Sequence, residues 1–159
     1  MPKDFNVFIS HARSDAAVAL ALKQCIEDDF NSLAVFMSSD GESIAAGEWF
    51  KQVKAALRDA KVVVLVCGPD TVRRPWLAFE AGAAWLAKGK SLALMVHGGL
   101  KPSELPSPYN HLQAVAVGRP GLEWMYRQLV DQFDRIKRMP SADRLDRAAA
   151  LLENALSKP

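Results

Sequence analysis

Residues 62–67 read Val-Val-Val-Leu-Val-Cys, an apolar run with no polar interruption. A strand that is apolar at every position is buried on both faces, which is typical of a parallel sheet covered by helices on both sides. Further apolar runs predict strands over Phe5–Ile9, Leu33–Met37, Leu92–Val96 and Ala114–Val117. The run at 62–67 therefore predicts an α/β protein and is the third of five strands.

Segments with apolar residues at helical spacing separate or follow these strands. They are Asp15–Asp29, Glu48–Ala60, Trp76–Ala87, Leu122–Lys137 and Ala142–Leu156. We expect Asp15 or Ser14 to cap the first of these helices. Strands that alternate with helices, joined by right-handed crossovers, favour a five-stranded parallel sheet in the order 2-1-3-4-5 with helices on both faces.

Length and composition indicate one ordinary globular domain. The chain has 159 residues, of which 50% are hydrophobic and 24% charged, and its net charge is +2. This charge gives no reason to expect a nucleic acid or a membrane surface as partner. We see no signal peptide and no apolar run long enough to span a membrane, so we expect a cytoplasmic protein.

The cysteines and histidines do not predict a metal site. Cys25 lies on an apolar helix face and Cys67 ends a buried strand, so both are interpreted as core residues. The three histidines, His11, His97 and His111, have no metal-binding spacing. His97 follows a predicted strand and is interpreted as structural.

Polar segments follow the first, second and third strands. Ser10–Asp15 follows the first, Ser38–Gly47 the second, and the third leads through Gly68 to Trp76 and Glu80. In a 2-1-3-4-5 sheet the strand order reverses between strands one and three, and ligands bind beyond the carboxyl ends at that reversal. We therefore expect these segments to form one site.

The chemistry of this site is narrowed by what the chain lacks. It has no GxGxxG, no Walker phosphate loop and no GxSxG turn. One reaction that a single carboxylate can support is the cleavage of certain glycosidic bonds. Such cleavage normally needs two carboxylates, one of which protonates the leaving group. A pyridinium leaving group departs as a neutral base and needs no proton, so for such a substrate Glu80 alone suffices. Trp76, one helical turn away, could stack on a flat ring, and Arg13 or the amides opening the first helix could hold phosphates. The alternative is that Trp76 is a core residue and Glu80 a solvated acid.

Three motifs resemble those of TIR (Toll/interleukin-1 receptor) domains. Phe5–His11 resembles the first box of the family, Ser38–Gly47 its BB loop, and Trp76–Glu80 the WxxxE pattern of plant and bacterial TIR enzymes. The resemblance extends from Phe5 to about Lys137. It implies a flavodoxin-like three-layer fold and the hydrolysis or cyclisation of NAD⁺ with release of nicotinamide, often in bacterial antiphage defence.

The resemblance also assigns residues and partners. Glu80 takes the position of the catalytic glutamate, and the substrate-binding positions are Ser10, His11, Arg13, Phe36, Ser38, Asp40 and Trp76. NAD⁺ is expected as substrate, with no resident cofactor or metal. Family members often become active on assembly through the BB loop, and an activating partner protein or second-messenger receptor is possible.

Two other functions stay open. Many TIR domains are non-catalytic interaction modules, and Phe79–Ala83 also resembles the E-x-G-x-A helix of nucleoside deoxyribosyltransferases. We divide the chain into a TIR domain, 1–139, and an amphipathic helix within 140–159, which Ser141 could cap. That helix either folds back on its own domain or serves as a dimerisation or linker helix.

Overall fold

The chain folds around one parallel sheet. The structure is a computed structural model, and it describes residues 5–39, 46–74, 80–84, 87 and 89–157. The strands are β1 (Val7–His11), β2 (Val35–Ser39), β3 (Val62–Cys67), β4 (Ser91–Val96) and β5 (Gln113–Ala116). All pair in parallel, in the order β2-β1-β3-β4-β5. The predicted fold class and strand order are confirmed, with β3 buried along its whole length.

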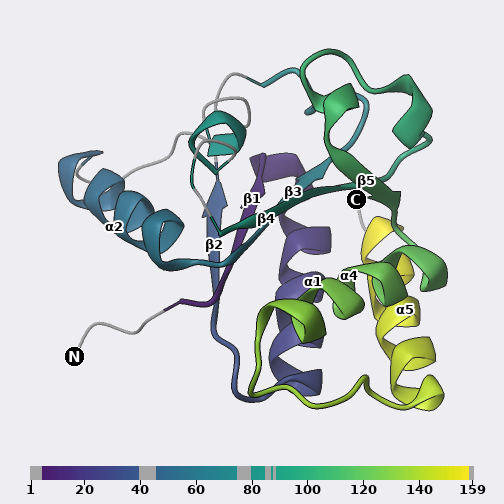
Figure 1. Ribbon diagram of the computed structural model, residues 1–159. Coiled ribbons are helices and arrows are strands. Elements are labelled where there is room, and N and C mark those ends of the chain that lie inside the picture. Colours follow the sequence, from purple (N-terminus) through teal and green to yellow (C-terminus); the bar gives the residue numbers. More distant parts are fainter. Residues whose placement is uncertain (1–4, 40–45, 75–79, 85–86, 88, 158–159) are drawn as a thin grey trace.

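Helices cover both faces of the sheet, as Figure 1 shows. On one face lie α1 (Ala16–Asp29), α4 (Arg119–Gln132) and α5 (Ala142–Leu156), packed on a core that includes Ile9, Val64 and Met95. On the other face lies α2 (Ala46–Asp59). The core on this face includes residues of the short helical segment 80–84. Alternate residues of each strand enter opposite cores because side chains along a strand point to opposite faces.

The ends of β1 and α4 differ from the prediction. β1 runs on through Ser10 and His11 because both pair with β2 and β3 on either side. α4 begins before the predicted Leu122, with Pro120 in its first turn, where the missing N–H of proline costs nothing. It ends at Gln132, before the predicted Lys137, because Phe133 adopts an extended conformation.

The last helix, α5, packs on its own domain. Its buried residues are Leu145, Ala148, Ala149, Leu152 and Ala155, which join the core beneath α1 and α4. Ser141 caps the helix by accepting from Arg144 N, as predicted. The apolar stripe of this helix is therefore covered by its own chain, although Leu156 is 39% exposed.

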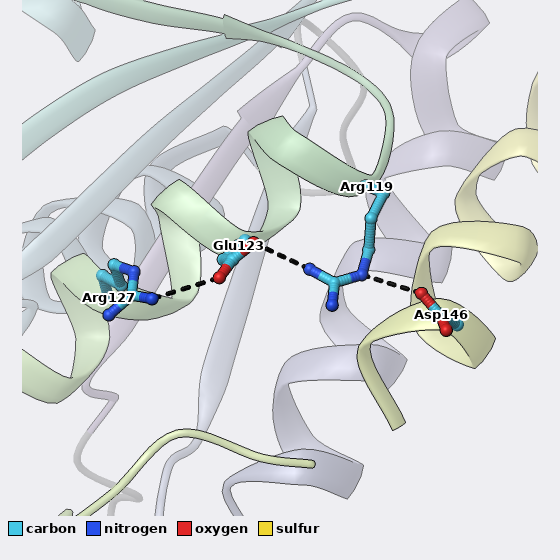
Figure 2. A network of polar contacts seen from close by, with 4 residues as sticks. All are labelled: Arg119, Glu123, Arg127 and Asp146. Atoms are coloured by element: carbon cyan, nitrogen blue, oxygen red, sulfur yellow. Dashed lines mark hydrogen bonds and ion pairs between the residues drawn. The ribbon is translucent and has the colours of Figure 1, made fainter. Parts of the chain in front are cut away.

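Polar contacts fasten α5 at two places. Figure 2 shows Arg119 of α4 donating through Nε to Asp146 of α5 at 2.8 Å and through Nη1 to Glu123 at 2.9 Å. Elsewhere, Asp29 at the end of α1 accepts from Arg144 Nε at 2.8 Å and from the buried Tyr126 hydroxyl at 2.6 Å. These bonds connect α5 to both α1 and α4.

Both cysteines lie in the core, as predicted. Burial raises the pKa of the Cys25 thiol to about 11 and that of Cys67 to about 12, so both stay protonated near neutral pH. No helix in the described part of the chain is long and apolar enough to cross a bilayer.

Candidate functional site

Buried polar side chains gather at or just beyond the carboxyl ends of the strands. Among the described residues, six polar or charged side chains other than tyrosine are buried: Ser10, His11, Asp15, Ser38, Thr71 and Glu80. The first two end β1, Ser38 lies near the end of β2, and the others follow β1 or β3 in the chain. Burying polar groups costs free energy unless they are hydrogen-bonded, so such a concentration is typical of a functional site. We call this set the rim.

The central contact of the rim joins Ser10 to Glu80. The Ser10 hydroxyl donates a hydrogen bond to Glu80 Oε1, and neither residue has any exposed surface. Ser10 is fixed by its register between Ser38 and Leu65, and Glu80 opens the described helical segment 80–84. The alternative that Glu80 is a solvated surface acid is therefore wrong, and the strand order brings it to the end of β1 as expected.

Five of the six remaining predicted site residues fall into three groups. His11 is buried, with its Nδ1 2.8 Å from the carbonyl oxygen of Ala12, and Ser38 is buried in β2. Arg13 is exposed beyond the end of β1. Trp76 and Asp40 lie outside the described residues. The substrate-binding roles of all five residues stay predictions.

Phe36 has a packing role in the structure. It lies in β2 two residues before Ser38, and its ring stacks on Phe8 with a centroid separation of 5.5 Å. Its other neighbour is Phe5, which meets it edge-on at 5.1 Å. Phe36 is partly buried and packs against the core on the α2 side of the sheet, and its substrate-binding role stays a prediction.

Sequence reasoning missed a second polar contact of the rim. Asp15, one of the two residues predicted to cap α1, occupies the N-cap position, but its side chain makes no capping hydrogen bond. Instead its Oδ1 lies 2.7 Å from Nε2 of His97, the residue that follows β4. These residues are 82 positions apart, so no spacing rule could have found the pair; the only signal was a histidine directly after a strand.

Two further groups in the core on the α2 side of the sheet, the Cys67 thiol and the Tyr109 hydroxyl, keep their protons near neutral pH. Burial, with a smaller contribution from Asp15, keeps the pKa of Cys67 at about 12, and burial likewise raises the pKa of Tyr109 to about 12. In the described ranges, no three His, Cys, Asp or Glu residues are grouped as metal ligands would be. Glu80 and Asp15 are the two carboxyl groups of the rim, and Glu80 is the one that accepts from Ser10 near the end of β1.

Comparison with known proteins identifies the family. No curated protein matches the chain. The family model described as the TIR domain matches residues 7–131, a stretch that begins with β1, ends within α4, and includes every residue of the rim. The match therefore covers the sheet and both residues of the Ser10–Glu80 contact. This chain belongs to the TIR domain family.

Proposed function

We propose that the chain cleaves the bond between nicotinamide and ribose in NAD⁺, and that Glu80 is the catalytic residue. The TIR family includes NAD⁺ hydrolases as well as non-catalytic members, so membership alone does not decide the activity. The supporting observation is the Glu80 carboxylate, buried and hydrogen-bonded by Ser10 where the strand order reverses. Ligands of open α/β sheets bind at such a reversal.

The reaction needs only one carboxylate. When the bond between ribose C1′ and the ring nitrogen breaks, its electron pair stays with nicotinamide, which leaves as a neutral base. Positive charge develops on the ribose, and the Glu80 carboxylate stabilises it and holds the ribose hydroxyls. Water then adds at C1′ and loses a proton to give ADP-ribose, or a nitrogen of the adenine ring adds to give a cyclic isomer.

Burial of Glu80 makes access part of the proposal. Because no surface of this side chain is exposed, the substrate reaches it only after a rearrangement that uncovers the carboxylate. TIR domains commonly self-associate, and we propose that association through the segment 38–47 favours the uncovered state. An activating partner protein could act in the same way. Depletion of NAD⁺ or production of a cyclic signal would suit antiphage defence signalling.

The test is nicotinamide release by the purified full chain. NAD⁺ is incubated with the protein over a wide concentration range, with and without a crowding agent, and products are identified by mass spectrometry. Release per molecule should rise with protein concentration. The Glu80→Gln variant should lose activity by at least about a hundredfold, because its neutral amide no longer stabilises positive charge. Its side-chain oxygen still accepts from Ser10, so the fold should be preserved.

A matched control is Glu104→Gln, the same change at an exposed glutamate in the 3-10 turn η2 (Pro102–Glu104). This variant should release nicotinamide as the wild type does. If the wild type releases none under any of these conditions, or if Glu80→Gln is as active as Glu104→Gln, the catalytic proposal is wrong.

The second candidate is a non-catalytic interaction module, which the burial of Glu80 favours. It predicts self-association without nicotinamide release. Light scattering identifies the protein concentrations at which the chain is associated. Nicotinamide release at those concentrations favours the enzyme, and its absence there favours the interaction module. The resemblance of 79–83 to nucleoside deoxyribosyltransferases gains no support from the family match, and we do not propose that activity.

A further inference from the structure

The Asp15–His97 contact spans three strands of the sheet. Asp15 closes the 3-10 turn η1 (Arg13–Asp15) after β1, and His97 follows β4, while β3 lies between these two strands. The bond between His97 Nε2 and Asp15 Oδ1, 2.7 Å long, therefore crosses the carboxyl end of β3. The side chains are 15% and 4% exposed, so little water competes for the bond.

Gly68, directly after β3, leaves the room that this bond needs. A Cβ atom on Gly68 would lie 2.9 Å from His97 Cε1 and 3.3 Å from both ring nitrogens. The imidazole thus occupies the space that any larger side chain at position 68 would take. The backbone N–H of His97 also donates to the carbonyl oxygen of Cys67 at 3.1 Å, which fixes His97 against β3.

The bond anchors a short loop that carries Arg13. The loop runs from Ala12 to Asp15, and the Asp15 N–H donates to the Ala12 carbonyl oxygen at 2.9 Å. The loop follows His11, the last residue of β1, and leads into α1. Because Asp15 does not cap α1 with its side chain, its one hydrogen bond to another described side chain is the bond to His97. His97 therefore holds the far end of the loop.

We propose that His97 is a positioning residue for the diphosphate of NAD⁺, an inference that rests on the proposed function. Arg13 and the first amides of α1 follow β1, the strand whose Ser10 contacts Glu80, and both are donors that suit a diphosphate. Their placement depends on the loop, and so on the anchor at Asp15. The Asp15 carboxylate is itself an anion at the start of α1, and the bond to His97 turns Oδ1 toward the end of β4. Without His97, the loop loses its anchor and the carboxylate is free to compete with phosphate for the helix amides.

The test separates substrate binding from chemistry in the full chain. KM and kcat for nicotinamide release from NAD⁺ are measured for wild type and four variants, together with the thermal unfolding midpoint. His97→Ala removes the bond, and His97→Gln keeps a side-chain N–H that can reach Asp15. Gly68→Ala retains the histidine at position 97 but displaces its ring, because the added Cβ would lie 2.9 Å from Cε1. His111→Ala removes an exposed histidine and is the matched control.

We expect His97→Ala and Gly68→Ala each to raise KM about five- to tenfold while kcat changes less than about twofold, as for the loss of one hydrogen bond that positions a binding group. His97→Gln should restore most of the wild-type KM, and His111→Ala should match wild type. An unchanged KM in His97→Ala overturns the inference. A fall in kcat and in the unfolding midpoint that His97→Gln does not rescue also overturns it, because that pattern indicates a general structural role.

Failure of the proposed function looks different. If the wild type releases no nicotinamide, both proposals fall together. If the wild type is active, Glu80→Gln is inactive and His97→Ala equals wild type, the proposed function stands and this inference alone is wrong.

Discussion

Two adjacent leucines in α5 test whether this helix is part of the folded domain. Leu152 has no exposed surface and belongs to the core beneath α1 and α4, whereas Leu151 is 48% exposed. Leu152→Ala should destabilise the chain by about 3–4 kcal/mol, the usual cost of emptying a leucine site in a packed core. Leu151→Ala should cost less than about 1 kcal/mol, since about half of its surface is already in water. The intrinsic helix propensity changes equally in both variants.

The assay is urea unfolding followed by circular dichroism, at two protein concentrations tenfold apart. In a domain of this size, about 3 kcal/mol corresponds to a fall in Tm of about 6–12 °C, which a thermal scan checks independently. Equal effects of the two substitutions would refute the docking of α5. Destabilisation by Leu152→Ala that grows as the protein is diluted would show that the helix is buried between copies of the chain and not within one.

Three further predictions concern stability. Tyr126→Phe removes the hydroxyl that donates to Asp29 at 2.6 Å, and urea unfolding should show a loss of about 1.5–3 kcal/mol; an unchanged midpoint would mean that the bond contributes nothing. Gly121→Ala would place a Cβ 2.0 Å from a β5 carbonyl oxygen, so α4 must shift and Tm should fall by several degrees; a Tm equal to wild type contradicts that close approach. Because the folded-state pKa values of Cys25 and Cys67 are raised from 9.0 to about 11 and about 12, unfolded thiols lose protons first as the pH rises. Stability should therefore be complete below pH 9 and decline above it, by up to about 1.4 kcal/mol per pH unit for each thiol; urea unfolding at a series of pH values that shows no decline would contradict this.

The sheet could be predicted because its signal is local. The unbroken apolar run of β3 requires helices on both faces, and alternation of strands and helices then leaves few topologies. The ends of elements were less predictable. Ser10 and His11 have the polarity of loop residues, yet they stay in β1 because ladder partners exist on both sides. Pro120 is a local signal for the start of α4, but the prediction followed the apolar spacing and placed the start at Leu122.

The location of the site could be predicted from the sequence, but the contacts between its residues could not. The strand order brings Ser10 and Glu80 to one edge, which the sequence predicts. That the two share a hydrogen bond with no exposed surface depends on packing across 70 residues, which no local pattern encodes. Asp15 shows the same limit: local propensity assigns its carboxylate to a helix cap, and a histidine 82 residues away takes it instead.

The family match and the core do not end together. The match stops at residue 131, while the core beneath α1 includes residues of α5 as far as Ala155. A chain that ended at residue 139 would expose α1 residues such as Cys25, whose Sγ contacts the Ala148 carbonyl oxygen. The segment beyond the match is therefore part of what stabilises α1, and through α1 the loop that Asp15 anchors.

Burial of Glu80 connects stability to the proposed activity. A ribose hydroxyl is the same kind of donor as the Ser10 hydroxyl, so substrate entry can exchange one hydrogen bond to the carboxylate for another. Ala81 follows Glu80 in the chain and is buried, so in the proposed mechanism a rearrangement that exposes such apolar residues would cost free energy. A contact between copies that covers such apolar surface would lower that cost without touching the carboxylate. In the proposed mechanism, association therefore activates the site without contributing a catalytic group, and for this reason release per molecule should rise with protein concentration.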